Sequence, residues 1–371
     1  MLQKSRNKLS HQELFLLPLF NIRRKMLMFL VAVLTFVLSL YTAFMIFWEN
    51  HIIQYQTWPW PTSSPLFSQA GAVNQNEYRP SFAYITQTEK CLPAHWMAND
   101  YLANSSLCNC HVYVISFKEP CDQTNASHIF YLHDKSVGWS GGRNLGYFAA
   151  RKRGYLYYIL FDDDVSLTYN EYTPKEFINN KIAPLQIFTQ FLLTDLPAAA
   201  AIDFNSLTPA NDVRNKWHRE CKRTEVPKTI PVYHVDALFN AFHKDVAVYL
   251  LPYYEKHDQT SFWLSQVYLM FKFQVVFYGR FEYFPFISCH NPAHRYNITG
   301  HFHHLQNLHI RKDMVDTMRE QTPAEYKNHP RFLSIMNYDF RSNFAGVLCV
   351  NPTKTRTEIV PYENMGPPEI I

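Results

Sequence analysis

Residues 141–169 read GGRNLGYFAARKRGYLYYILFDDDVSLTY, and the rest of the chain is arranged around this stretch. The pattern predicts a helix over 143–153, a turn at Arg153-Gly154 and a strand over 155–161. A run of seven apolar or aromatic residues is long enough for a fully buried strand, and the glycine marks its entry. The strand delivers three consecutive aspartates to its carboxyl end.

The three aspartates, Asp162, Asp163 and Asp164, indicate a metal site. Neighbouring carboxylates repel one another, and a hard divalent cation with oxygen ligands relieves that repulsion. Such an ion is commonly shared with the phosphates of a nucleotide. We therefore expect a metal-dependent site for a nucleotide-linked sugar here. The alternative is a solvated turn or helix cap, which would need only one carboxylate.

The N-terminal part predicts a membrane anchor. Residues 1–25 are polar and basic, and residues 26–48 contain no charge, which is long enough for a helix to cross a hydrocarbon core of about 30 Å. A signal peptide would have an apolar stretch of only about 7–15 residues and a small-residue cleavage site. Because Arg23-Arg24-Lys25 precede the span, we expect a cytoplasmic tail and a single-pass type II topology.

Beyond the span, residues 49–90 are expected to form a stem, and residues 91–371 one lumenal catalytic domain. The Trp58-Pro59-Trp60-Pro61 segment leaves open that the stem packs on the domain as an extended arm. The aromatic content of 16% argues against a disordered protein. The net charge of +4 is modest and partly in the tail, so no nucleic-acid partner is expected.

The seven cysteines all follow the predicted span. No CxxC pair occurs, so a structural zinc site is not expected. Four cysteines within 91–121 suit disulfides in an oxidising lumen, and the odd total leaves one thiol free or paired with another chain in a disulfide-linked dimer. Glycosylation sequons begin at Asn104, Asn125 and Asn297, on the same side of the membrane.

The remaining segments alternate between strand and helix patterns. A capping box at 173–176 opens a helix that Pro184 should kink or break. Alternation of this kind predicts an α/β fold with a mostly parallel sheet flanked by helices. Strands are expected at 111–117, 128–132, 198–204, 232–242, 274–278 and 281–287, and helices at 261–271 and 301–320.

The Gly-Arg-Asn helix start followed by an apolar strand that ends in Asp-Asp-Asp resembles the GT-A (Rossmann-like) fold of nucleotide-sugar glycosyltransferases, in a family 2-like, DxD-containing form. The resemblance covers roughly residues 110–290. It implies that Asp162 lies near the ribose and the metal, that Asp164 ligates Mn²⁺ or Mg²⁺, and that Asp163 supports them. It also implies that Arg143 and Asn144 meet the nucleotide, Arg143 together with helix-end amides.

The resemblance also implies an acidic residue before the helix at 261–271, where Asp258 stands. If the reaction inverts the anomeric centre, Asp258 is the expected catalytic base and Glu255 the second candidate. The alternative is that Asp258 caps the helix that follows it. His290 is the expected histidine ligand of the metal, with His294 next, while Asp236 is expected to be structural.

Two other functions stay open. Gly138-Trp139-Ser140-Gly141-Gly142 matches the G-x-S-x-G elbow of serine hydrolases, although the residues before it make a poor buried strand. The second alternative is a non-catalytic lumenal protein that binds glycans or serves as a scaffold. The preferred hypothesis is a glycosyltransferase that acts on a glycan, glycoprotein or glycolipid acceptor in the Golgi membrane, with the endoplasmic reticulum as the other location. In it, the glycines at 138, 141 and 142 let the backbone turn close to the nucleotide.

Overall fold

The computed structural model describes residues 80–98, 100–122, 126–204, 213–259, 262–277, 279–291, 308–321, 327 and 346–349. These residues belong to one compact unit that spans Ser63–Ile371. The predicted tail, the span at 26–48 and most of the predicted stem lie outside the described residues. Within the described part of the chain, no helix combines the length and the apolar character that a membrane crossing needs.

The strands form a single mixed sheet in the order β10-β7-β9-β6-β8-β4-β1-β2-β3, with β5 paired to β9. The strands are β1 (Phe82–Thr88), β2 (Cys110–Ser116), β3 (Ile129–His133), β4 (Tyr157–Asp162), β5 (Ser166–Tyr169), β6 (Ala199–Phe204), β7 (Ile230–His234), β8 (Phe239–His243), β9 (Phe281–His290) and β10 (Gly346–Val347).

Strand β1 lies inside the parallel part of the sheet, where it pairs in parallel with β2 on one side and β4 on the other. Its side chains are almost all buried, because layers of helices cover both faces. This strand corrects the predicted boundary between stem and domain: the fold begins by Phe82, not at Cys91. The sequence analysis missed it because a single seven-residue strand stands in a segment without further apolar pattern.

The expected mostly parallel sheet is wrong in its second half. Among the described strands, four pairings are parallel and five are antiparallel. The segment 232–242, expected as one strand, contains β7, a turn and β8, and the turn returns β8 antiparallel to β4. The strand expected at 274–278 is also wrong, since helix α11 runs through Val276. A short apolar run does not distinguish a buried strand from a buried helix.

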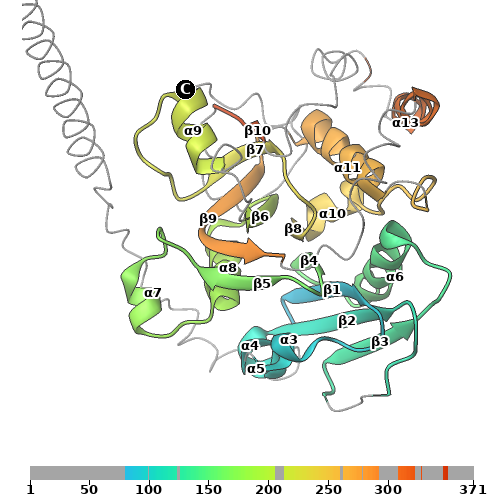
Figure 1. Cartoon of the computed structure of the whole chain (residues 1–371), viewed down its shortest axis with the longest axis horizontal. Coiled ribbons are helices and arrows are strands. Elements are labelled where there is room, and N and C mark those ends of the chain that lie inside the picture. Colours follow the sequence, from blue (N-terminus) through green and yellow to red (C-terminus); the bar gives the residue numbers. More distant parts are fainter. Residues whose placement is uncertain are drawn as a thin grey trace, which may run out of the picture. The chain divides into compact units, whose positions relative to one another are not determined.

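The helices lie in two layers (Figure 1), with α6, α10 and α11 on one face of the sheet and α3, α4, α5 and α8 on the other. Helix α13 contacts α11 from outside. The helices are α3 (Ala94–Ala98), α4 (Asp100–Ala103), α5 (Ser105–Cys108), α6 (Trp139–Arg151), α7 (Lys175–Asn179), α8 (Pro184–Asp195), α9 (Val213–Cys221), α10 (Lys244–Leu250), α11 (Phe262–Val276) and α13 (Leu308–Gln321).

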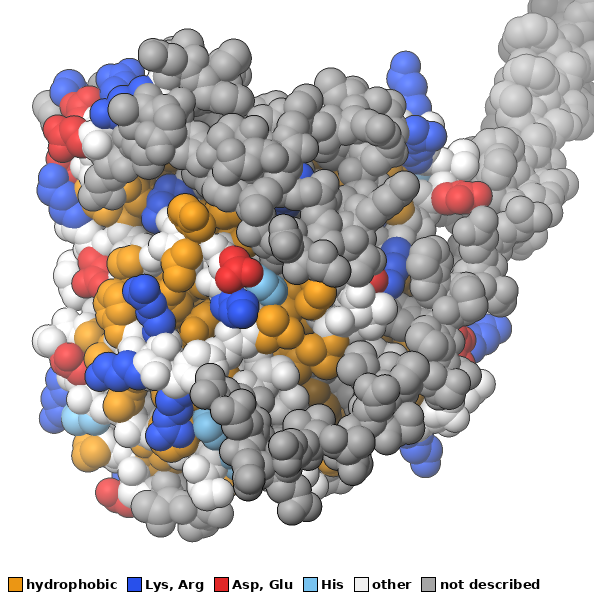
Figure 2. All heavy atoms as spheres, turned by 180° about the vertical axis from the view of Figure 1, so that it is seen from behind, with side chains coloured by type: hydrophobic (Ala, Val, Ile, Leu, Met, Phe, Trp, Pro, Cys, Tyr) orange, Lys and Arg blue, Asp and Glu red, His pale blue; other side chains and the backbone are white. Residues whose placement is uncertain are grey.

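The surface carries apolar side chains among charged ones. Figure 2 shows hydrophobic side chains lying between Lys and Arg on the face opposite to that of Figure 1. Val248 and Tyr249 of α10, for example, are about half exposed. Such scattered exposure is ordinary, because more than half of a folded protein's surface is contributed by apolar atoms.

Helix α6 packs unusually close to the sheet. A Cβ atom at Gly146 would lie 2.5 Å from Ile85 Cγ2 and 2.6 Å from Ile115 Cδ1. Gly141 and Gly142 are also within α6, so the expectation that they form a turn against the nucleotide is wrong, whereas Gly138 is the extended N-cap residue before the helix. The glycine that does turn the chain is Gly154, with φ +72° before β4, as the sequence pattern predicted.

We predict that Gly146→Ala lowers the free energy of unfolding by about 1–2 kcal/mol, because the cost of overpacking against two buried isoleucines exceeds the gain in helix propensity. The matched control is Gly141→Ala in the same helix, where the new methyl group would have 3.6 Å of space. We expect that control to be neutral or stabilising. Urea denaturation measures both, and a Gly146→Ala variant more stable than the parent would contradict the close packing.

Candidate active site

The three aspartates lie at the carboxyl end of β4, in the turn that leads to β5. Two residues of α3 hold the backbone of this turn. Trp96 Nε1 donates to the carbonyl oxygen of Asp163 at 3.0 Å, and His95 Nε2 lies 3.0 Å from the carbonyl oxygen of Val165. Trp96 is buried against Phe161. The position of the aspartate turn is therefore fixed from the helix layer as well as from the sheet.

Arg143 is buried directly behind the first aspartate. The residue is 1% exposed, and its Nη2 donates to Asp162 Oδ1 at 2.5 Å. Nη1 donates to the carbonyl oxygen of Ala237 at 3.1 Å, and the ring of Trp139 lies 4.0 Å from the guanidinium carbon. A desolvated cation over tryptophan gains about 2 kcal/mol. In this arrangement Arg143 neutralises a carboxylate of its own chain, and its contact with a nucleotide stays a prediction.

The surroundings of the aspartate turn are strongly acidic. Burial raises the pKa of Asp162, Arg143 opposes this effect, and Asp164 adds to it. Burial, and next the charge of Asp162, raise the pKa of Asp236 to about 6. Asp236 also accepts a hydrogen bond from the backbone of Leu238, in the turn between β7 and β8, consistent with the structural role expected for it. A further positive charge would stabilise this group of carboxylates.

Strand pairing brings His290 toward the same turn. His290 ends β9 and pairs with Ser166, two residues after Asp164. Among the described residues, no three His, Cys, Asp or Glu side chains are already grouped to hold a metal. His294 lies outside the described residues. The carboxylates are nonetheless the donors that Mn²⁺ and Mg²⁺ prefer, and such ions are commonly held by one or two carboxylates plus substrate phosphates. The donor chemistry therefore fits the ion that the sequence analysis expects.

Asn144 fixes the loop 253–258 instead of facing a ligand. It is 2% exposed; its Oδ1 accepts from the backbone N–H of Tyr253 at 2.6 Å, and its Nδ2 donates to the carbonyl oxygen of the same residue at 2.9 Å. Nδ2 also lies 2.5 Å from Glu255 Oε1. Asn144 thus orients Glu255, the second candidate for the catalytic base.

Asp258 caps α6. Its carboxylate accepts from the backbone N–H of Ser140 at 2.8 Å and of Gly141 at 3.0 Å. Gly138, the N-cap residue, has no side chain to do this, and a Cβ atom there would collide with Asp258. The cap therefore serves a helix more than 100 residues earlier in the chain. The amides that the sequence analysis offered to a phosphate bind this carboxylate. The role of Asp258 as a base stays a prediction.

Ser140 lies inside the first turn of α6 and is fully buried. Its hydroxyl donates to Ser265 Oγ at 2.6 Å, and Ser265 donates to the carbonyl oxygen of Tyr254. A hydrolase nucleophile must be reached by its substrate, at a sharp turn directly after a strand. The geometry of Ser140 therefore disfavours the nucleophile elbow.

Three site residues were missed by the sequence analysis. Trp96 and His95 act on backbone atoms, which leaves no pattern in the sequence. Gln87 pairs in register with Asp162 at the end of β1, and its Nε2 donates to the carbonyl oxygen of Trp139 at 2.9 Å. Recognising the strand FAYITQT would have placed Gln87 beside the aspartates.

No family model matches this chain, and a search of curated proteins finds no match. Among solved structures, the chain is similar to TarS 1–349 of S. aureus, at 12% identity over 56% of this chain and 60% of that one, with a TM-score of 0.34. It is also similar to the mannosyltransferase PcManGT of Pyrobaculum calidifontis in complex with GDP-Man and Mn²⁺, at 12% identity over 70% and 68%, with a TM-score of 0.40. A third match is GalNAc-T7 with UDP, GalNAc and Mn²⁺, at 11% over 58% and 44%, with a TM-score of 0.35.

The chain thus spans 60% of the TarS fragment and less than half of GalNAc-T7. PcManGT is described as a mannosyltransferase, and both it and GalNAc-T7 were solved with Mn²⁺ and a nucleotide or nucleotide-sugar. These TM-scores are low. We therefore describe the fold from the strand order of this chain and argue its function from its own residues.

We predict that Asp258→Ala lowers the free energy of unfolding by about 1–2 kcal/mol, the usual cost of removing a helix cap. Asp258→Asn keeps one acceptor oxygen and should lose less. Ala at the neighbouring exposed Gln259 is the control and should change little. Urea denaturation of the three variants measures the effect. An Asp258→Ala variant as stable as the parent would show that the cap does not matter.

Proposed function

We propose that this chain is a metal-dependent glycosyltransferase that transfers a sugar from a nucleotide-sugar donor to a glycan or glycoconjugate acceptor. One observation carries the proposal: the aspartate turn lies at the topological switch point of the sheet. From β1 the chain proceeds to β2 and β3 on one side and then returns to β4 on the other. Open α/β sheets bind their ligands at the carboxyl ends of the strands at such a point, where Gln87 and Asp162 lie side by side.

In this proposal Asp164 and Asp162, with His290, hold Mn²⁺ or Mg²⁺, and Asp163 supports the turn. The bound ion would stabilise the negative charge that develops on the departing nucleoside diphosphate. Arg143 and the helix layer hold the aspartates in place.

The acceptor side is assigned to the loop 253–258. The acceptor oxygen forms a bond to the anomeric carbon, the bond from that carbon to the diphosphate breaks, and the acceptor proton passes to a carboxylate. Asp258 is the proposed base, with Glu255 as the second candidate, since both carboxylates are oriented by contacts with α6.

We further propose a single-pass type II protein of the Golgi membrane, anchored by residues 26–48. Six of the seven cysteines pair as Cys91–Cys121, Cys108–Cys110 and Cys221–Cys349, which suits an oxidising lumen. The seventh, Cys289, is buried in β9. A thiol in that position does not favour the disulfide-linked dimer that the odd cysteine count allowed.

We predict that the full-length chain releases nucleoside diphosphate from a nucleotide-sugar in the presence of Mn²⁺, and that Asp164→Ala lowers this turnover by at least about 100-fold. UDP-linked sugars and GDP-Man are the donors to test first. The control is Asp245→Asn, which changes an exposed aspartate in α10. Because His243 at the end of β8 pairs with Tyr157 at the start of β4, this control lies near the end of β4 that is opposite to the aspartates. Full activity of Asp164→Ala would refute the metal assignment.

The same preparation separates the two other functions. Labelling of Ser140 by a fluorophosphonate, without nucleotide-sugar turnover, would favour the hydrolase. Binding of a glycan with neither turnover nor labelling would favour the non-catalytic module.

A further inference from the structure

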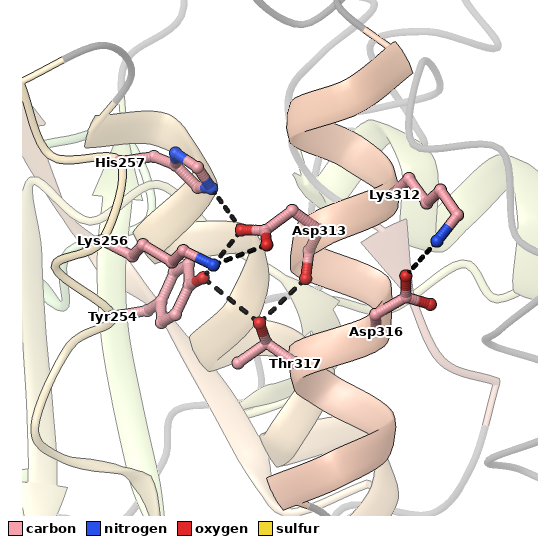
Figure 3. A network of polar contacts seen from close by, with 7 residues as sticks. All are labelled: Tyr254, Lys256, His257, Lys312, Asp313, Asp316 and Thr317. Carbon is pink, nitrogen blue, oxygen red and sulfur yellow. Dashed lines mark hydrogen bonds and ion pairs between the residues drawn. The ribbon is translucent and has the colours of Figure 1, made fainter.

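The loop 253–258 is held from two opposite sides. Tyr253, Glu255 and Asp258 face α6, through Asn144 and the helix cap. Tyr254, Lys256 and His257 face α13 (Figure 3). Residues 256–259 form a turn, in which the backbone N–H of Asp258 donates to the carbonyl oxygen of Glu255, so a few residues suffice to make both sets of contacts.

The contacts of the loop with α13 are called the outer contacts here, and those with α6 the inner contacts. A single carboxylate on α13 makes most of the outer contacts. Asp313 Oδ1 accepts from Lys256 Nζ at 2.5 Å, and Asp313 Oδ2 accepts from His257 Nε2 at 2.7 Å and from the hydroxyl of Tyr254 at 3.3 Å. The hydrogen bonds from Lys256 and then His257 hold the pKa of Asp313 below its usual value. Thr317, one turn further along the helix, lies 3.3 Å from the same tyrosine hydroxyl.

This arrangement differs from an ordinary surface ion pair. An isolated exposed pair contributes little, because solvent screens it and two long side chains must be ordered. Asp313, in contrast, gathers three donors from four consecutive residues of one loop, and its helix contacts α11. The neighbouring pair Lys312–Asp316 stays within α13 and does not touch the loop (Figure 3).

The outer contacts are linked to the inner ones through short paths. His257 directly precedes Asp258, whose backbone N–H donates to the carbonyl oxygen of Glu255 at 2.9 Å. On the other side, the carbonyl oxygen of Tyr254 accepts from Ser265, which accepts from Ser140 in the first turn of α6. A displacement of the loop on its α13 side would therefore reach the two carboxylates on the other side.

We propose that Asp313 of α13 is a positioning residue, which holds the carboxylates of Asp258 and Glu255 in place through the loop 253–258. The catalytic part of this inference rests on the proposed glycosyl transfer, since only then do the two carboxylates face a reacting acceptor. The mechanical part, which concerns how the loop is held, does not depend on the reaction.

Hydrogen exchange in the full-length chain tests the mechanical part. The reporters are the backbone amides of Ser140 and Gly141, which donate to Asp258. We expect Asp313→Ala to speed their exchange by about tenfold or more, as local opening becomes easier, with no change in β4. The matched control is Asp316→Ala, which removes an aspartate from the same helix without touching the loop, and it should leave both amides unchanged.

Unchanged exchange of the two amides in Asp313→Ala would overturn the proposal, and so would faster exchange throughout the sheet, which would show only a general loss of stability. His257→Ala removes part of the same contact from the loop side and should speed the same two amides. It keeps the test decisive if Asp313→Ala does not fold.

Turnover tests the catalytic part. With an active donor, we expect Asp313→Ala to lower kcat by about tenfold or more, since small misplacements of reacting groups are costly, while the Kd for that donor's nucleoside diphosphate (UDP or GDP) with Mn²⁺ stays within about twofold. Asp316→Ala should change neither. Altered amide exchange with an unchanged kcat would overturn the positioning role. A parent chain without any transfer would refute the proposed function, while the exchange experiment would still decide how the loop is held.

Discussion

The ion pair between Arg143 and Asp162 is the interaction on which the candidate site depends. Taking each ion out of water costs several kcal/mol, and their mutual attraction offsets that cost only with good geometry and additional hydrogen bonds. Here the guanidinium satisfies both requirements, with the carbonyl oxygen of Ala237 and the ring of Trp139 as further partners. The contact exists because α6 lies so close to β1 and β2, which in turn requires a glycine at 146. The close packing of α6 on the sheet thus brings the positive charge of Arg143 to Asp162.

The carboxylates around Arg143 carry more negative charge than its single guanidinium can neutralise. Asp162 and Asp236 both interact with this one guanidinium, and Asp163 and Asp164 follow directly in the chain. Burial is the main cause that raises the pKa values of Asp162 and Asp236, and the neighbouring carboxylates add to it. Structural interactions alone would not require so many carboxylates at the end of one strand. The excess is accounted for if a cation belongs to the functional state.

The sequence was informative where local pattern determines structure. The apolar run before Asp162 correctly predicted β4, and Pro184 correctly marked a helix boundary, since α8 begins there. Helix α6 begins four residues before the predicted start. The prediction was late because glycines at 138, 141 and 142 lower the helix propensity, and because the capping side chain comes from Asp258, far along the chain.

Long-range contacts could not be predicted in the same way. The bond from Ser140 to Asp258 joins residues 118 apart, and no local pattern announces it. The same holds for Asp313 and for the carbonyl contacts of Trp96, which depend on tertiary packing. The sequence therefore predicted that the aspartates end a buried strand, whereas the contacts that orient them could not be predicted.

The partners of two positive groups, the N-terminal amides of α6 and the guanidinium of Arg143, bear on the proposed metal dependence of the site. In many nucleotide-binding folds a helix N-terminus and an arginine hold the phosphates. In this chain the amides of α6 are bound to Asp258, and the guanidinium of Arg143 is bound to Asp162. A diphosphate that approaches the aspartate turn therefore meets carboxylates, while Arg143 and the amides of α6 already bind Asp162 and Asp258. Coulomb repulsion in this partly desolvated place would exclude it unless a divalent ion came with it. The proposed metal dependence thus rests on how the protein uses its own positive charges, and not only on the presence of three aspartates.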